Sequence, residues 1–554
     1  MSAVPANPLS AREAGAAPER ALDRPAVAAA VLQQAAPGRI GTVLEPAAPG
    51  AADVRTRAVR SSPRRTDGNL HWPLLAVLAV QGALSLRLTW SNTAFQDEAL
   101  YLRAGHLEWA HWLHGVVIPD FPSYFSGAPV LYPPVGALAD SVGGLAAARI
   151  LSLSLMLAVT SLLAATTSRL YGRRAAILAA ALFATLTGTQ FLGALATFDS
   201  TALFLLALAA WLGIRAAECA PARRTVLLAC AGVALAGANG AAYSTVLLTP
   251  VVVAVVAAAT WRQHGLRATL AAGGAVLCCW TAVIGAAVVV GGRQYWRGVM
   301  ASTVDRPAAD TSVRLVLQHA YIWTSLVLVL ALLGAVLAAL TKMRARLLPL
   351  LLTAAAVAVP AAQANLHTTV SLQKHVVFGA WFAAIAAGYA LARLSRVDPG
   401  RGWAPVMALP IAASTLFGSV GQAGALFQVW PNSAAVIQAL RAAVASHPGS
   451  YLAEDYDVEA YYLRSEAAWQ RWNSTYYFRH PDAAPGIASY RAAISSHVFA
   501  LVILDFGDTQ ATDRHIVADM ALAGGYHVLA RVGHFTIWAT DTSARRSGAS
   551  RARS

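Results

Sequence analysis

The sequence predicts a mainly helical protein that crosses a membrane many times and carries a small α/β domain near its C-terminal end. Of its 554 residues, 57% are hydrophobic and only 12% are charged, whereas soluble domains have about 25% charged residues. Apolar stretches long enough to cross a bilayer recur between residues 72 and 421. After residue 424 these long stretches give way to short mixed segments, which are typical of a water-soluble fold.

The net charge of +15 does not indicate a nucleic-acid-binding protein. Most of the arginines lie in short loops between apolar segments, where the rule that positive loops stay in the cytoplasm explains them. Only two lysines occur, Lys342 and Lys374. All four cysteines lie in or beside apolar segments, so the C-terminal region has no disulfide framework. We therefore expect the partner surface to be the lipid bilayer.

Four regions follow from the change of composition along the chain. Residues 1–70 are rich in Ala, Pro and Arg without hydrophobic periodicity, which predicts a disordered cytoplasmic tail. Residues 71–423 form the predicted transmembrane domain, and residues 424–541 the predicted extracytoplasmic α/β domain. The last residues, 542–554, are predicted to be a second disordered tail.

Eleven apolar segments in the transmembrane region are candidate spans by length and hydropathy. Their approximate limits are 72–90, 146–168, 175–195, 200–214, 225–238, 243–260, 268–291, 318–340, 347–363, 374–392 and 403–421. One set of short connecting loops carries 14 Arg and Lys residues, and the longer loops on the opposite side carry 7. The positive-inside rule places the first set, with the N-terminal tail, in the cytoplasm. An odd number of spans then places residues 424–554 outside.

The C-terminal region alternates between strand and helix patterns. The segment 451–463 predicts a short strand followed by a helix, 497–506 predicts a β-strand, and 526–540 predicts two strands around a turn. Helical patterns lie near 433–446, 485–496 and 511–523. This order predicts a small α/β domain.

An acid pair, Asp97 and Glu98, follows directly after the first span in "FQDEALYLRAGH". Carboxylates are costly at a membrane unless they are solvated or used. Asp97 could cap a helix that begins at Glu98, a role that is compatible with catalysis. As a catalytic group, a carboxylate at this boundary would take a proton from a substrate.

A second acid, Asp199, lies between the third and fourth spans on the same predicted side of the membrane. It could cap the fourth span. Two separate outer turns that each place an acid at the membrane surface favour a shared site.

Three basic side chains lie on the same predicted side. Arg87 is near the outer end of the first span, and Lys374 and His375 open the tenth. Snorkelling to the interface would explain an isolated Arg or Lys there. Together with the acids, these residues predict a site with cations for a phosphate and a carboxylate for a proton.

An ordered set of segments resembles the GT-C superfamily of membrane glycosyltransferases, and especially the group of protein O-mannosyltransferases and the lipid A aminoarabinose transferase. The segments are "FQDEALYLRAGH", "YPPVGAL", "TFDSTALFLLALAAW", "YSTVLLTP" and "SLQKHVVFGAWFAAIAAGYAL". The resemblance covers roughly residues 72–421 and implies a helical bundle of the GT-C type with an outer domain. The Asp-Glu motif is short, so the order of the segments carries the resemblance.

The resemblance implies transfer of a sugar from a polyprenyl-phosphate carrier to an acceptor hydroxyl outside the cytoplasm, with inversion. The sugar would be a mannose-like hexose or a pentose, and the acceptor a protein, lipid or glycan. Asp97 matches the general base of the family, and Glu98 and Asp199 are the other catalytic candidates. The substrate-binding candidates are Arg87, Tyr101, Arg103, Tyr132, Lys374 and His375. No metal ligand or certain cofactor is implied, although a divalent cation is compatible with the site.

Two other function classes fit the composition. The protein could transport or flip a lipid-linked precursor of the cell envelope, or it could be a non-catalytic assembly protein. Transporters tend to place charges and broken helices near the middle of the membrane. Asp97 and Asp199 lie instead at the outer ends of spans, which favours chemistry at the surface.

Overall fold

A computed structural model describes residues 71–306, 308–341, 347–395, 416–454, 456–507 and 509–541. All of them belong to one structural unit of the chain, residues 70–554. The tails predicted at 1–70 and 542–554 lie outside the described residues, as does most of the predicted span 403–421.

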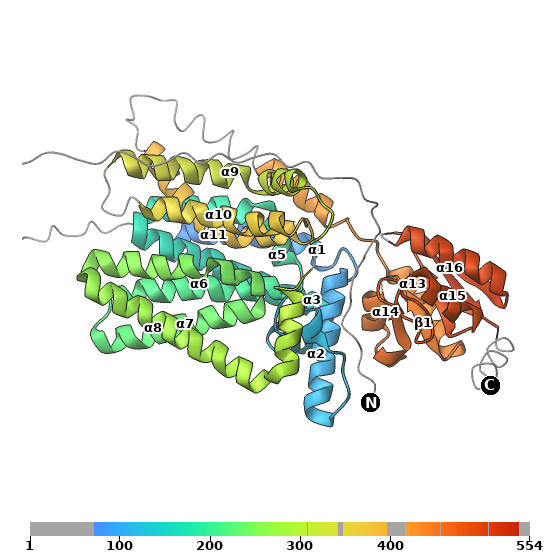
Figure 1. The fold of residues 1–554 in the computed structure, drawn as a ribbon. Helices are drawn as coiled ribbons and strands as arrows, with labels where there is room; N and C mark the ends of the chain where they lie inside the picture. Colours follow the sequence, from blue (N-terminus) through green and yellow to red (C-terminus); the bar gives the residue numbers. More distant parts are fainter. Residues whose placement is uncertain are drawn as a thin grey trace, which may run out of the picture. The chain divides into compact units, whose positions relative to one another are not determined.

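The membrane region is a bundle of long apolar helices that lie side by side (Figure 1). Its helices are α1 (His71–Thr89), α3 (Tyr132–Tyr171), α4 (Arg173–Thr185), α5 (Thr187–Ala194), α6 (Phe198–Ala217), α7 (Pro221–Ala241), α8 (Thr249–Ser302), α9 (Val313–Leu340), α10 (Leu347–Asn365) and α11 (Leu372–Leu394). Among the described residues, eight helices are long and apolar enough to span a bilayer, and the bent pair α4–α5 is a ninth candidate. The predicted multi-pass membrane protein is thus confirmed.

Helix α8 contains two of the predicted spans, 243–260 and 268–291. Its 54 residues would extend about 80 Å at 1.5 Å per residue, far beyond the ~30 Å of a bilayer core. The backbone leaves helical geometry at Gly265, where φ is 76°. Glycine adopts this left-handed conformation without the steric penalty of a Cβ atom. This break lies between the two predicted spans, and a second break occurs at Gly292, where φ is 71°.

The predicted third span, 175–195, is not a continuous helix. Helices α4 and α5 are bent by 67° at Leu186, whose backbone is extended. The side-chain amide of Gln190 donates to the carbonyl of Thr185 at 2.9 Å, and the hydroxyl of Thr187 donates to the side chain of Gln422 at 2.8 Å. Such side-chain partners satisfy polar groups that a break exposes within a membrane protein. Helix α5 ends soon after this break, and α6 begins at Phe198.

Helix α11 is the most buried of the candidate spans, with 89% of its apolar window inside the protein. Glycines let its neighbours approach closely: a Cβ atom at Gly379 would lie 2.3 Å from the carbonyl oxygen of Ala355 in α10. At Gly388 it would lie 2.5 Å from the carbonyl oxygen of Ala175 in α4. Small residues allow such contacts between membrane helices. Helix α11, whose first turn carries Lys374, is therefore packed closely against α10 and α4.

Between α1 and α3 lie helix α2 (Gln96–His114) and the short turn η1 (Phe121–Ser123), and η2 (Tyr243–Leu248) precedes α8. Helix α2 begins at the end of the first outer turn and contacts α3. It carries the acid pair in its first turn.

The C-terminal domain is a five-stranded sheet of order β2-β1-β3-β5-β4 between helices. Its elements are α13 (Ala434–Ser446), β1 (Ser450–Ala453), α14 (Tyr456–Tyr462), η3 (Trp469–Arg471), β2 (Trp472–Ser474), α15 (Ile487–Ser495), β3 (Phe499–Leu504), α16 (Gln510–Ala523), β4 (Tyr526–Val532) and β5 (Phe535–Thr540). Strand β1 is parallel to β2 and β3, and β5 is antiparallel to β3 and β4. The predicted α/β domain is confirmed, with β2 as an additional strand.

Successive residues of the strands face opposite sides of this sheet. Tyr451 and Leu501 pack with α13, whereas Leu452 and Val502 pack with α15 and α16. The sheet therefore has helices on both faces, and its central strands β1 and β3 are apolar on both sides for that reason.

Candidate active site

Three charged side chains from distant parts of the chain meet at the ends of the membrane helices. The Nζ atom of Lys374 lies 2.5 Å from Oδ2 of Asp97 and 3.6 Å from Oδ2 of Asp199. Both acids belong to the first turn of a helix, α2 and α6, where the helix dipole favours negative charge. Lys374 comes from the first turn of α11. One cation thus balances two carboxylates.

The three side chains differ in access to solvent. The side chains of Lys374 and Asp199 are 3% and 0% exposed, whereas that of Asp97 is 27% exposed. The Oδ2 atom of Asp199 also accepts a hydrogen bond from the hydroxyl of Thr197 at 2.9 Å, but its Oδ1 atom is buried without a hydrogen-bond partner among the described residues. Asp97 is therefore the acid of this cluster that a substrate can reach.

Glu98 has a different environment from its neighbour. It is fully buried in a two-point ion pair, in which Nε and Nη2 of Arg149 donate to its two carboxylate oxygens at 2.8 and 2.7 Å. The backbone N–H groups of Phe95 and Ala196 also donate to it, at 2.9 and 2.7 Å. With four hydrogen bonds, Glu98 has little capacity left for a substrate, so this geometry fits a positioning role.

The helix caps differ from those that the sequence predicts. Helix α2 begins at Gln96, its N-cap is Phe95, and Glu98 rather than Asp97 binds the cap backbone. Helix α6 has its N-cap at Thr197, so Asp199 lies inside the first turn. The side chain of a cap residue accepts hydrogen bonds from backbone N–H groups that follow it in the helix. The two predicted caps, Asp97 and Asp199, instead direct an oxygen to Lys374.

Arg149 binds several backbone carbonyls of the turn between α1 and α2. Besides Glu98, it donates to the backbone carbonyls of Leu88, Asn92 and Thr93 at 2.9 to 3.0 Å. These carbonyls lie between the end of α1 and the start of α2, so one buried guanidinium fixes the segment that precedes Asp97. The sequence places Arg149 only among the loop charges. A single arginine beside a long apolar run is the signal that could have identified it.

Arg103, a predicted substrate-binding residue, lies against the C-terminal domain. It is buried and ion-paired with Asp457 of α14, and its guanidinium lies 5.1 Å from the ring centre of Tyr456. Burial raises the pKa of Asp457, and the charge of Arg103 opposes this shift. Asp457 was not predicted as a partner, because nothing local in the sequence connects it with α2.

A second polar contact joins the same elements. Asp140 of α3 accepts a hydrogen bond from the hydroxyl of Tyr461 in α14 at 2.6 Å and contacts Nε2 of His106 in α2 at 2.6 Å. The indole N–H of Trp469 donates to the carbonyl of Val117 at 2.9 Å. The C-terminal domain therefore packs on α2, α3 and the loop that follows α2.

The predicted tyrosines are buried near the acids. The ring of Tyr101 lies 4.6 Å from that of Phe198 and 5.3 Å from that of Phe125. Burial raises the pKa of Tyr101 well above its usual value, with further contributions from the charges of Asp97 and Asp199. Its hydroxyl thus remains a hydrogen-bond donor at neutral pH. Tyr132 is buried in the first turn of α3, and its hydroxyl lies near that of Ser152.

Arg87 is not drawn into the cluster of acids. Its guanidinium donates to the side chain of Gln190 at 3.1 Å and lies 5.4 Å from the ring centre of Phe427. Within the described part of the chain it makes no ion pair with an acid. His375 follows Lys374 and is half-buried, with its ring 6.3 Å from that of Phe378. The structure therefore joins Asp97, Asp199 and Lys374 and leaves Arg87 beside them as a separate, exposed cation.

No family model matches the sequence, and no curated protein matches it significantly. Solved structures do match. ArnT from Cupriavidus metallidurans in the apo state has a TM-score of 0.55 and 15% identity, and the match covers 85% of this chain and 98% of that one. For the same protein bound to undecaprenyl phosphate, the TM-score is 0.55 and the identity is 16%, with the same coverage of both chains. A third match is the archaeal oligosaccharyltransferase AglB from Archaeoglobus fulgidus, in complex with an inhibitory peptide and a dolichol-phosphate. Its TM-score is 0.53 and its identity 14%, and the match covers 85% of this chain and 74% of that one.

The chain has the GT-C fold. This agreement confirms the fold that the ordered sequence segments imply, and it extends into the C-terminal region, because the match to ArnT covers 85% of this chain. In this fold, Asp97 and Asp199 lie in the first turns of two different helices, α2 and α6.

The side chains at the cluster indicate whether a divalent cation, which the sequence neither required nor excluded, would fit there. Among the residues that the structure describes, no group of three or more His, Cys, Asp or Glu side chains is placed to hold a metal ion. A metal ion would have to approach Asp97 and Asp199, and the ammonium group of Lys374 already lies between their carboxylates. The observed donor set therefore suits an internal cation better than a metal.

Proposed function

We propose that this protein is a membrane glycosyltransferase that moves a sugar from a polyprenyl-phosphate carrier to an acceptor hydroxyl, with inversion at the anomeric carbon. The observation that carries this proposal is the cluster of Asp97, Asp199 and Lys374, in which Asp97 alone is accessible. The GT-C fold supports it, since ArnT and AglB were solved with undecaprenyl phosphate and dolichol-phosphate bound.

Asp97 acts as the general base in this mechanism. The acceptor oxygen bonds to the anomeric carbon as the bond from that carbon to the carrier phosphate breaks, and the hydroxyl proton passes to Asp97. A carboxylate within hydrogen-bond reach of the acceptor accelerates such a step by removing the developing positive charge. Lys374 fixes the Oδ2 atom of Asp97 at 2.5 Å, which leaves Oδ1 to face the acceptor.

The phosphate that leaves carries negative charge, which a nearby cation stabilises. An ammonium group has three N–H donors, and Lys374 uses one of them for Asp97 while Asp199 lies 3.6 Å away. Lys374 is buried, so it is a candidate for the phosphate contact only if the substrate enters beside Asp97. Arg87, exposed at the end of α1, is a second candidate that a phosphate could reach from the lipid side.

The geometry of the cluster does not select the sugar or the acceptor, because Asp199 and Tyr132 are buried and Asp97 is the accessible acid. The choice of substrates proposed here rests on the family resemblance. The transferred group would be a mannose-like hexose or a pentose, and the acceptor a protein, lipid or glycan.

The decisive experiment supplies membranes that contain the protein with radiolabelled polyprenyl-phosphate mannose, galactose or arabinose. We expect one donor to transfer its label to an acceptor that can be extracted and identified. Membranes without the protein are the control. If no donor loses its sugar but a labelled donor crosses the bilayer of sealed vesicles, the protein is instead a transporter or flippase of lipid-linked precursors.

A second prediction concerns orientation. We propose that the N-terminus is cytoplasmic and that the C-terminal domain lies on the same outer side as Asp97, in the cell membrane. The contact of Arg103 with Asp457 supports the second part, because it joins α2 to that domain. A reporter that is active only outside the cytoplasm should work when fused after residue 424 and fail when fused after Arg346. The reverse pattern would place Asp97 on the cytoplasmic face.

A further inference from the structure

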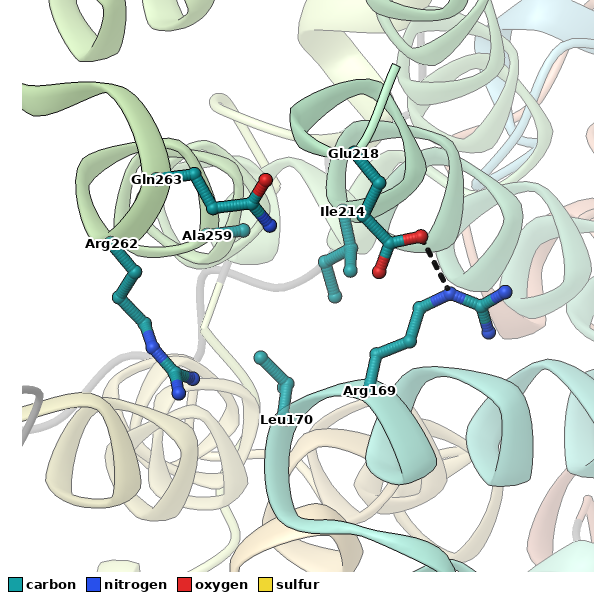
Figure 2. Close-up of a pocket in the computed structure, with 7 residues that line it drawn as sticks. All are labelled: Arg169, Leu170, Ile214, Glu218, Ala259, Arg262 and Gln263. Atoms are coloured by element: carbon teal, nitrogen blue, oxygen red, sulfur yellow. Dashed lines mark hydrogen bonds and ion pairs between the residues drawn. The ribbon is translucent and has the colours of Figure 1, made fainter. Parts of the chain in front are cut away.

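A polar pocket lies at the opposite ends of the helices from the candidate active site. Asp199 is in the first turn of α6, and Glu218 follows the last turn. The 20 residues of α6 extend about 30 Å, which is the thickness of a bilayer core. A cavity of about 210 Å³ opens beside Glu218, between α3, α6 and α8 (Figure 2). This pocket therefore lies at the membrane surface opposite to Asp97.

The walls of the pocket carry more positive than negative charge. Arg262 and Gln263 of α8 lie on one side, and Arg169 of α3 and Glu218 on the other (Figure 2). Glu218 is already paired, at 2.6 Å with Arg215 and at 3.4 Å with Arg169. Arg262 has no hydrogen bond or ion pair with any residue that the structure describes. The pocket thus has one neutralised carboxylate and an uncommitted guanidinium.

The size and lining of the pocket define the ligand class. Pockets for drug-sized ligands have about 300–1,000 Å³, so 210 Å³ suits a smaller group. Arginine binds phosphate oxygens through a planar fork of N–H donors, and the amide of Gln263 offers further donors. Leu170 and Ile214 supply apolar walls beside these polar groups. Basic pockets between membrane helices are known to bind the head groups of anionic lipids.

We propose that this pocket binds a phosphate anion at the surface opposite to the active site, with Arg262 and Gln263 as its ligands. The phosphate can be the diester of an anionic phospholipid or free phosphate from solution, since both present the same oxygens. The neighbouring Trp261 is 56% exposed, and aromatic side chains of this kind favour the headgroup level of a membrane. The site is separate from sugar transfer and requires no substrate of that reaction.

The test measures binding by the purified full-length protein. The melting temperature is compared in nanodiscs of phosphatidylcholine alone and of phosphatidylcholine mixed with phosphatidylglycerol, and in detergent with inorganic phosphate or chloride at equal ionic strength. The native protein should melt higher with phosphatidylglycerol, with phosphate, or with both, and the pattern identifies the source of the anion. Arg262→Gln should weaken binding about tenfold or more, because a charge-assisted contact is lost.

Two further variants sharpen the result. Glu218→Gln removes the one carboxylate that lines the pocket, so it should strengthen binding of the anion. Arg223→Gln removes an exposed cation of α7 that does not line the pocket, so it should change nothing. Binding that is equal in the native protein, Arg262→Gln and Glu218→Gln would overturn the proposal. An equal loss in Arg223→Gln would also overturn it, because it would indicate a general attraction to charge.

Discussion

Replacing Asp97 by Asn should lower turnover by about 10²-fold or more, which is the typical contribution of a positioned general base. The amide has the shape of the carboxylate but cannot accept the acceptor proton. The change also removes one of the two carboxylates at Lys374, but Asp199 remains 3.6 Å away to balance the ammonium charge. The rate of label transfer at saturating donor is the measurement.

The control for this variant is Asp120→Asn, which makes the same chemical change in the same outer loop. Asp120 is exposed and makes no side-chain hydrogen bond at the turn that it precedes. Both variants should reach the membrane in native amounts, since neither side chain is fully buried. Near-native turnover of the Asp97→Asn protein would remove Asp97 from the mechanism, whereas an equal loss in both proteins would indicate a general effect of charge in this loop.

The bundle could be predicted from the sequence because a bilayer leaves a chain few choices. Every backbone polar group must be satisfied within the lipid, so long apolar runs become helices. Hydropathy does not report where such a helix bends, and for that reason the break at Leu186 inside the predicted span 175–195 was not predicted. Such a break depends on local partners, here the bond from Gln190 to the carbonyl of Thr185.

The site could be predicted only in part, for a related physical reason. Charged residues stand out in the sequence because charge is rare beside apolar runs, and so Asp97, Asp199 and Lys374 were all candidates. Their partners are set by tertiary packing. Lys374 is 277 positions from Asp97, and Arg103 is 354 positions from Asp457. No local pattern distinguishes a lysine that binds phosphate from one that balances two carboxylates.

The different tasks of Asp97 and Glu98 follow from their positions on α2. Adjacent residues of a helix point about 100° apart, so one side chain can face solvent while its neighbour faces the core. Asp97 is 27% exposed, whereas Glu98 is fully buried beside Arg149. The acid pair therefore combines an accessible carboxylate with the anchor that orients it.

Arg149→Met should have the largest effect on stability of any change in this region. The substitution leaves the carboxylate of Glu98 buried without its cation, which typically costs about 3–5 kcal/mol. It also leaves three backbone carbonyls of the first outer turn without their donor. The melting temperature of the purified protein should fall sharply, and the fraction that remains folded should transfer sugar slowly, because the turn that orients Asp97 is no longer fixed.

The double variant Glu98→Gln with Arg149→Met separates charge from geometry. The glutamine that replaces Glu98 is neutral, so the penalty of an unpaired buried charge disappears, and its amide oxygen can still accept a bond from the backbone of Ala196 or Phe95. The double variant should therefore melt at a higher temperature than Arg149→Met alone while turnover stays low, because the carbonyls of Leu88, Asn92 and Thr93 still lack their donor. If Arg149→Met alone melts like the native protein, the ion pair of Arg149 with Glu98 does not stabilise the turn between α1 and α2. Recovery of turnover in the double variant would mean that Arg149 serves only to neutralise Glu98 and does not position Asp97.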